Sequence, residues 1–228
     1  MWKSPDAIMN SAKMWAVTGN YGSGKTELSL NLALESVRKE PTALVDLDIV
    51  NPYFRSAERE SLLTDGGVRV LKPTFAMSTV DIPALPAEIL SIFERGERVW
   101  LDVGGDDTGA TALGRYKPQL DKAGAQMLFV VNARRPLTRD VDSIMDLLER
   151  VCARARMPVS ALCNNTNLGA QSTIEDVLLG AEIVREVARR AGVAHAFHGV
   201  AAHLLGELPE EMRPFAFAVT PYMRPEWF

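Results

Sequence analysis

Short apolar runs alternate with helix-length stretches along the whole chain. In the helical stretches, apolar residues recur every three or four positions, most clearly from Val141 to Val151 and from Ile174 to Val187. Alternating strands and helices are typical of a parallel sheet with helices on both faces. We therefore predict a doubly wound α/β fold with a mostly parallel sheet. The runs that favour strands are 14–18, 42–45, 68–71, 99–101, 127–131, 159–163 and about 194–200.

A proline-bearing connection follows the third of these runs. It extends from Leu71 to Pro86 and predicts a helix that begins at about 84–87, because proline is favoured in the first turn of a helix. We find no internal repeat, low-complexity tract or linker. The pattern predicts a single domain over residues 1–228.

Composition narrows the classes of protein. The chain is 47% hydrophobic and 24% charged, which is ordinary for a globular domain. A net charge of −4 and a pI near 5.5 argue against a surface that coats nucleic acid. The two cysteines, Cys152 and Cys163, make no disulfide framework and no C-x-x-C site, and His195 and His198 fall on opposite faces of an expected strand. With no signal-peptide core and no run of membrane-spanning length, we expect a cytoplasmic protein that binds no membrane.

Residues 19–26 carry the clearest chemistry. They read Gly19-Asn20-Tyr21-Gly22-Ser23-Gly24-Lys25-Thr26, a complete G-x-x-x-x-G-K-[ST] loop between an expected strand and an expected helix. Backbone N–H groups of such a loop converge on a phosphate, and the helix N-terminus adds positive potential. Lys25 is then expected to reach the β- and γ-phosphates, and the Thr26 hydroxyl to bind Mg²⁺. The motif predicts a P-loop NTPase fold.

Other polar clusters also follow expected strands. Asp46 and Asp48 follow the second run, and Asp102 and Gly105 follow the fourth. In a parallel sheet all these positions share the carboxyl edge, where ligands bind. Asp102-Val103-Gly104-Gly105 matches a D-x-x-G pattern, in which the carboxylate holds Mg²⁺ and a glycine N–H approaches the γ-phosphate. Asp102 is the first choice for the metal, with Asp106 and Asp107 as alternatives.

With strand-Asp46-Leu47-Asp48 about twenty residues after the P-loop, the chain resembles the MinD, ParA and ArsA ATPases. These belong to a group of dimer-forming P-loop NTPases that also contains signal-recognition GTPases. The resemblance covers residues 13 to about 167. It implies that Asp46 lies near Mg²⁺, that Asp48 positions or polarises the attacking water, and that residues 49–56 form the first switch.

The chain departs from that family at Asn20. The deviant loop of those ATPases carries a second lysine there, which reaches the phosphates bound by the partner subunit. The sequence therefore does not support lysines exchanged across a homodimer. A transition-state cation would have to come from Arg55, from Arg134 or Arg135, or from a partner protein.

The run Asn164-Asn165-Thr166-Asn167 suggests the base. A guanine site at this edge usually reads N-K-x-D, and the amide of Asn167 has one acceptor oxygen where a carboxylate would have two. An Asn side chain matches adenine, since it both donates and accepts. In the resembling ATPases an Asn just after this strand does so, which implies Asn164 first and Asn165 second.

We therefore predict a Mg²⁺-dependent ATP-binding protein that hydrolyses ATP slowly and acts as a conformational switch on a client protein, with a homodimer as a further assembly. Two alternatives stay open. One is a small-molecule kinase or ATP-dependent ligase in which Asp48 activates the acceptor. The other is a non-catalytic, ATP-gated adaptor. The 49–56 and 72–86 segments would distinguish them, through an acceptor pocket or an exposed apolar patch.

Overall fold

The computed structural model describes residues 1–48, 57–72, 90–105 and 107–222. Its centre is an eight-stranded sheet in the order β3-β2-β4-β1-β5-β6-β7-β8, and every neighbouring pair of strands is parallel. This confirms the predicted doubly wound α/β fold. The strands are β1 (Met14–Gly19), β2 (Thr42–Asp46), β3 (Arg69–Leu71), β4 (Arg98–Asp102), β5 (Gln126–Val131), β6 (Ala161–Asn164), β7 (His195–Ala201) and β8 (Ala216–Val219).

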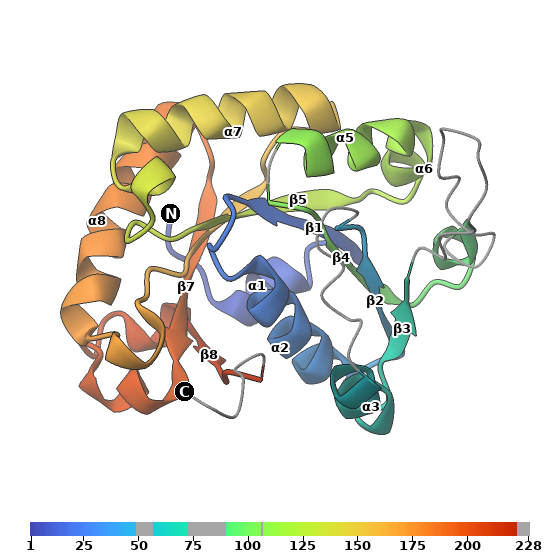
Figure 1. Cartoon of the computed structure of the whole chain (residues 1–228), viewed down its shortest axis with the longest axis horizontal. Helices are drawn as coiled ribbons and strands as arrows, with labels where there is room; N and C mark the ends of the chain where they lie inside the picture. Colours follow the sequence, from blue (N-terminus) through green and yellow to red (C-terminus); the bar gives the residue numbers. More distant parts are fainter. Residues whose placement is uncertain (49–56, 73–89, 106, 223–228) are drawn as a thin grey trace.

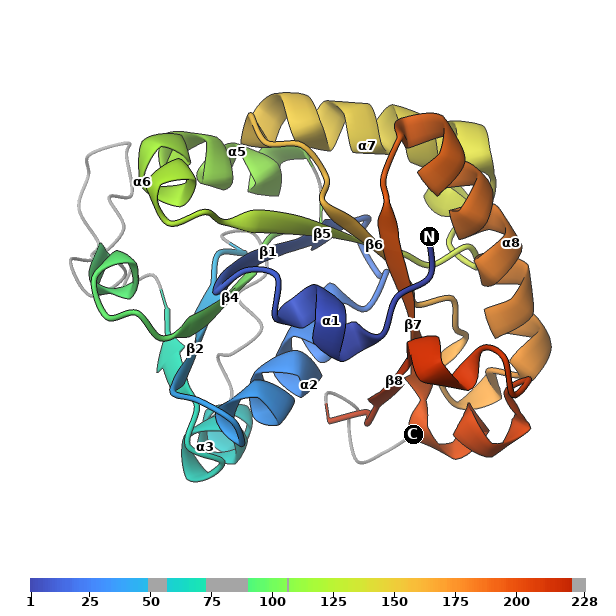
Figure 2. The same ribbon diagram turned by 180° about the vertical axis from the view of Figure 1, so that it is seen from behind.

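Helices cover both faces of the sheet (Figures 1 and 2). One layer contains α5, α6 and α7, and the other contains α1 and α2, while α8 lies beside α7 and β7. The α-helices are α1 (Pro5–Met9), α2 (Lys25–Val37), α3 (Ala57–Asp65), α5 (Asp107–Arg115), α6 (Lys117–Lys122), α7 (Val141–Ala155) and α8 (Ile174–Ala191). Short 3₁₀ turns are η2 (Ser91–Phe93), η3 (Pro136–Thr138), η4 (Gly169–Gln171), η5 (Ala202–Glu207) and η6 (Arg213–Phe215).

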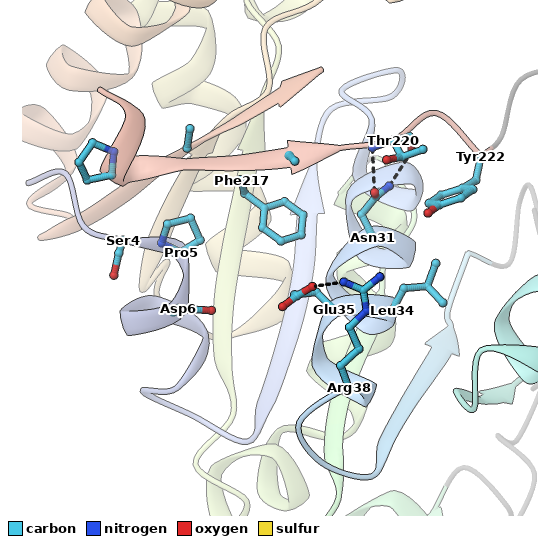
Figure 3. A pocket seen from close by; sticks show the side chains of 13 residues that line it. Ser4, Pro5, Asp6, Asn31, Leu34, Glu35, Arg38, Phe217, Thr220 and Tyr222 are labelled. Carbon is cyan, nitrogen blue, oxygen red and sulfur yellow. Dashed lines mark hydrogen bonds and ion pairs between the residues drawn. The ribbon is translucent and has the colours of Figure 1, made fainter. Parts of the chain in front are cut away.

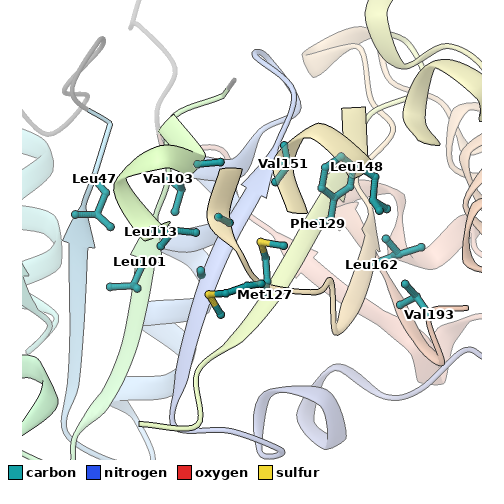
Figure 4. Close-up of a cluster of buried hydrophobic side chains, with 14 of the residues drawn as sticks. Leu47, Leu101, Val103, Leu113, Met127, Phe129, Leu148, Val151, Leu162 and Val193 are labelled. Carbon is teal, nitrogen blue, oxygen red and sulfur yellow. The ribbon is translucent and has the colours of Figure 1, made fainter. Parts of the chain in front are cut away.

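Each layer of helices packs on its own apolar core. On the α5–α7 face, Leu101, Met127 and Phe129 of the sheet pack against helical side chains such as Leu113 and Leu148 (Figure 4). The opposite core joins α1 and α2 to the other face of the same strands. Because the central strands are buried on both faces, they read as continuous apolar runs in the sequence.

Local capping explains where the two long predicted helices begin. The Asp140 side chain accepts the Ser143 N–H at 2.9 Å before α7. At α8, the Asp176 carboxylate accepts the Thr173 N–H at 2.9 Å in a capping box, and Gly192 ends the helix with a φ of 67°. Both helices match the periodicity in the sequence.

The elements that were not named from the sequence include α1 and the edge strand β8, which pairs with β7 from His198–Ala216 to Ala201–Val219. The helix predicted at about 84–87 lies outside the described residues. Among those residues, none of the helices has the length and apolar character needed to cross a membrane.

Candidate nucleotide site

The P-loop connects β1 to α2 at the middle of the sheet (Figure 1). Gly19, Gly22 and Gly24 adopt positive φ values of 140°, 73° and 85°, which other residues rarely tolerate. The loop is also closely packed. A Cβ at Gly19 would lie 2.3 Å from the Val130 carbonyl oxygen, and one at Gly24 would lie 2.4 Å from Asn165 Nδ2. Glycine is therefore required by both conformation and contact.

Lys25 lies beneath this loop. Its side chain is 7% exposed, and Nζ donates to the Asn20 carbonyl oxygen at 2.9 Å. Asn20 in turn accepts the Tyr21 N–H on its Oδ1 at 2.9 Å, while Tyr21 itself is 69% exposed. The ammonium group is thus held within the loop by its backbone.

The loop after β4 meets the P-loop at Gly105. A Cβ at this position would lie 2.8 Å from Lys25 Nζ and 2.8 Å from Tyr21 Cα. Gly104 is also close to the segment after β2, since a Cβ there would lie 3.2 Å from Asp48 Oδ1. The predicted D-x-x-G segment therefore joins the P-loop to the segment after β2.

Asp46 and Asp102 end two neighbouring strands, and Asp102 lies next to Lys25 and Thr26. Asp46 accepts the Asp48 N–H at 2.9 Å. Asp102 Oδ1 accepts the Ser29 hydroxyl at 3.3 Å, whereas its buried Oδ2 has no hydrogen-bond partner in the described part of the chain. Burial, and secondarily the charge of Asp48, raise the pKa of Asp102 to about 6, although the nearby Thr26 hydroxyl and Lys25 ammonium act to lower it.

Two cavities open on either side of the P-loop. One, of about 390 Å³, is lined by Lys25, Thr26 and Asp48 together with loop residues. The other, of about 230 Å³, is lined by Asn165, Asn167 and His203 among others. The two cavities adjoin along the loop, because four residues line both of them: Gly22, Gly24, Glu27 and Arg135.

The structure separates the two asparagines that were expected to recognise the base. Asn164 is fully buried; its Nδ2 donates to the Val177 carbonyl at 2.9 Å, and its Oδ1 accepts the Thr166 N–H at 3.2 Å. Asn165 instead donates from Nδ2 to the Ser23 carbonyl at 2.8 Å, in the wall of the smaller cavity. The geometry therefore favours Asn165, the second choice from the sequence, and the assignment to adenine stays a prediction.

Asn132 was not singled out from the sequence, although Arg134 and Arg135 of the same turn were named as candidate cations. Its Nδ2 donates to the Asn167 carbonyl at 3.0 Å, and its Oδ1 accepts the Arg134 N–H at 3.0 Å. Asn132 is fully buried and thus ties the turn after β5 to the turn after β6. An asparagine directly after a buried strand was the available signal.

The candidate cations differ in their surroundings. The Arg134 Nε donates to Asp176 Oδ1 at 2.6 Å, within the cap of α8. The Arg135 Nε donates to the Gly22 carbonyl at 2.8 Å, within the P-loop. Arg55, Asp106 and the predicted first switch at 49–56 lie outside the described residues, as does the 72–86 connection beyond Lys72.

A further cavity, of about 460 Å³, lies between α1, α2 and β8 (Figure 3). Beside it, the Asn31 amide forms two hydrogen bonds with the Thr220 backbone, at 2.9 and 2.8 Å. Glu27 Oε1 accepts the Tyr222 N–H at 2.7 Å. These contacts attach the segment after β8 to the P-loop helix.

Cys163 is a buried core residue, and His195 and His198 both lie on β7.

Comparisons with known proteins identify the fold. Neither protein-family models nor curated proteins gave a match. Among solved structures, the chain is similar to FtsY from Thermotoga maritima, with a TM-score of 0.53 and 19% identity over 82% of this chain and 62% of that one. Chloroplast FtsY from Physcomitrella patens gives 0.55 and 16% over 82% and 58%.

A third similar structure is the signal recognition particle 54 kDa protein from Aeropyrum pernix in complex with GDP, with a TM-score of 0.51 and 21% identity over 82% of this chain and 41% of that one. The chain thus spans 41–62% of the length of these three proteins. At such low identity the likeness shows the fold alone. The chain has a P-loop NTPase fold, and the resemblance to the MinD and ParA branch stays a prediction.

Proposed function

We propose that the protein binds Mg·ATP at the P-loop, hydrolyses it slowly, and uses the cycle as a conformational switch on a client protein. One observation carries the proposal. The carboxyl edge brings together the P-loop, Lys25, Thr26, Asp102 and Gly105, and this set provides each group that phosphate binding needs. A structural loop would not need a buried lysine whose Nζ is held at the Asn20 carbonyl of the loop.

The residues present fit Mg²⁺. Asp102 offers a buried oxygen without a hydrogen-bond partner in the described part of the chain, and the Thr26 hydroxyl lies nearby. Oxygen ligands of this kind suit Mg²⁺, which is usually held by one or two carboxylates and by phosphate oxygens. Thr26 and Asp102 would hold the ion, with Asp46 beside them. When bound, the ion would neutralise charge on the β- and γ-phosphates.

The protein's own groups account for phosphate binding. The N–H groups of the loop and the N-terminus of α2 supply positive potential to the phosphates. Lys25 is expected to leave the Asn20 carbonyl for the β- and γ-phosphates when the nucleotide enters. Gly105 is expected to donate its N–H to the γ-phosphate, which is supported by its contact with Tyr21 and Lys25.

Asp48 is the proposed residue that positions the attacking water. It lines the same cavity as Lys25 and Thr26, and it lies against Gly104. The Asn20 side chain folds back on the Tyr21 N–H and carries no charge. Without a second lysine in the loop, little charge stabilisation is supplied to the transition state, so we expect slow turnover.

Adenine is the proposed base, with Asn165 in the wall of its cavity. Among the described residues that line this cavity, Glu27 carries the carboxylate that a guanine base could bind. Its Oε1 already accepts the Tyr222 N–H. Guanine recognition needs an acceptor for two N–H groups, which the amides of Asn165 and Asn167 do not match.

Single-turnover hydrolysis tests this function. The wild-type protein, Thr26→Ala and Lys122→Ala would be compared with radiolabelled ATP, with Mg²⁺ and with excess chelator. Lys122 is an exposed lysine at the end of α6 and serves as the control. We expect slow release of phosphate that requires Mg²⁺ and is lost in Thr26→Ala only. Turnover that is independent of both Mg²⁺ and Thr26 would contradict the proposal.

A further inference from the structure

Arg135 packs directly on the middle of the P-loop. Its Nε donates to the Gly22 carbonyl at 2.8 Å. A Cβ at Gly22 would lie 3.2 Å from this Nε and 3.4 Å from Cζ, so the guanidinium occupies the space that a side chain at position 22 would need. Two features therefore favour glycine at position 22: the turn of the loop requires a positive φ, and the Arg135 guanidinium occupies the space of a side chain.

The turn that carries Arg135 is fixed by hydrogen bonds at both ends. The Arg135 N–H donates to the Asn132 carbonyl at 3.1 Å, and the Arg135 carbonyl accepts the Thr138 N–H at 3.0 Å. The buried Thr138 hydroxyl also donates to the Asn132 carbonyl at 2.7 Å. Arg135 is thus held over the loop before any ligand binds, which reduces the entropy lost on binding.

The position of Arg135 is at the junction of the two cavities. It lines the cavity that contains Lys25 and Asp48, and it also lines the cavity that contains Asn165. Among the described residues that line the two cavities, the lysine side chain is that of Lys25 and the arginine side chain is that of Arg135. Lys25 is buried under the loop, so Arg135 is the cation on its outer side.

The guanidinium retains donors for a ligand. Apart from the bond to Gly22, it has no hydrogen-bond or ion-pair partner within residues 1–48, 57–72, 90–105 and 107–222. Arg134 differs, since Asp176 already neutralises it at 2.6 Å. The two adjacent arginines are therefore not equivalent, and only one is available at the site.

We propose that Arg135 binds the phosphates of the nucleotide nearest the ribose, as a second, cis-acting cation of the site. The inference rests on the proposed function. Arg135 lies between the cavity lined by Lys25 and Asp48 and the cavity lined by Asn165. This position favours contact with the α- and β-phosphates, which ATP and ADP share. Arg135 then contributes to the affinity for both nucleotides, and it does not act as the cation of the hydrolysis transition state.

Calorimetric titration of Mg·ATP and Mg·ADP tests this role. The proteins are the wild type, Arg135→Ala, Arg135→Lys and the control Arg139→Ala. Arg139 lies on the same turn, its side chain is 77% exposed, and its Nε forms an ion pair with Asp140 at 3.5 Å. We expect Arg135→Ala to weaken Mg·ATP and Mg·ADP by about the same factor, roughly tenfold, as a charge-assisted hydrogen bond at an exposed site should.

Arg135→Lys should recover part of the affinity, because it keeps the charge but loses the planar fork. Arg139→Ala should bind as the wild type does. Steady-state kinetics should show KM rising more than kcat falls.

Three results would overturn the proposal: unchanged affinities, a loss for ATP without a loss for ADP, or a fall in kcat at unchanged affinity. If the wild type itself bound neither nucleotide, the proposed function would fail as well, which distinguishes that failure from a failure of Arg135 alone.

Discussion

Asp46 and Asp102 are direct partners in the parallel ladder between β2 and β4. Each is the last residue of its strand and is only 1% exposed. Two buried carboxylates at adjacent strand ends are unfavourable unless a cation or a proton accompanies them. The raised pKa of Asp102 reflects this burial. The pair therefore supports the proposal that a divalent cation binds beside the P-loop.

Asp48→Asn is expected to slow hydrolysis while leaving Mg·ATP affinity nearly intact. The reason is that positioning of the attacking water matters chiefly in the transition state. We expect a fall of about 10²- to 10⁴-fold in single-turnover rate, the range usual for a lost general base. Asp121→Asn, at an exposed position on α6, is the control. A variant that hydrolyses ATP at the wild-type rate would show that Asp48 is misassigned.

The same assay tests the consequence of Asn20. Basal hydrolysis should be slow in the wild type, whether or not it dimerises, and Asn20→Lys should not by itself produce fast hydrolysis. Fast basal turnover would mean that the transition state has a source of charge stabilisation that we have not identified.

ATP should bind more tightly than GTP, and Asn165→Ala should reduce that preference. A matched hydrogen bond to the base is worth about 1–3 kcal/mol when buried, or roughly ten- to a hundredfold in affinity. Asn164→Ala is the informative neighbour. It should lower the free energy of unfolding by about 1–3 kcal/mol, because the Val177 carbonyl and Thr166 N–H lose a buried partner.

Competition binding and chemical denaturation of the two variants measure these effects. If GTP bound more tightly, or if Asn164→Ala removed the preference while Asn165→Ala kept it, the base assignment would be wrong.

Gly105→Ala should impair nucleotide binding while the domain stays folded. The added methyl group would lie 2.8 Å from the Tyr21 backbone and 2.8 Å from Lys25 Nζ, so the P-loop or the Gly105 loop must move. A strain of about 1–3 kcal/mol corresponds to a loss of roughly tenfold or more in Mg·ATP affinity. Gly206→Ala is the control, since its Cβ meets open space. Equal affinities of the two variants would contradict a close contact at Gly105.

His198 should make folding stability depend on pH. It is fully buried, and its ring centroid lies 3.9 Å from that of Trp2, with the two rings tilted by 34°. Burial, with the Arg185 charge, lowers its pKa from 6.5 to about 4. Between these values the unfolded chain binds the extra proton, so stability is retained above pH 6.5 and lost as the pH falls towards 4. The loss from this residue is about 3 kcal/mol.

Urea unfolding at several pH values, with the wild type and His198→Phe, checks this expectation. The variant keeps an aromatic ring beside Trp2 but cannot titrate, so its stability should fall less steeply between pH 6.5 and 4. Parallel pH profiles for the two proteins would contradict the assignment.

The sequence predicted the centre of the fold well, because the central strands are buried on both faces and read as apolar runs. The runs at 42–45 and 99–101 each stop one residue before the end of the observed strand. The last residues of these strands, Asp46 and Asp102, are polar but still pair in the ladder. Ala216–Val219 was missed because a four-residue edge strand has exposed positions and little pattern. Helix α1 was missed because it has only five residues, too few for a periodicity.

The site was predictable in its P-loop and less so elsewhere. A phosphate loop is a local motif, so Gly19 to Thr26 could be read directly. The roles of Asn164 and Asn165 depend instead on which side of the sheet end each amide faces, and adjacent residues of one type give no signal for that. Likewise, Arg134 and Arg135 differ only through Asp176 and Gly22, which are distant in the sequence.

Calorimetric titration of Mg·ATP into the wild type, Lys25→Ala and the control Lys122→Ala measures whether the P-loop binds Mg·ATP through Lys25. Lys25 is the buried cation held in the loop, so its loss removes the charge that reaches the β- and γ-phosphates. We predict measurable binding by the wild type and Lys122→Ala, and no measurable binding by Lys25→Ala at the same concentrations. Undiminished Mg·ATP affinity in a folded Lys25→Ala protein would contradict the account.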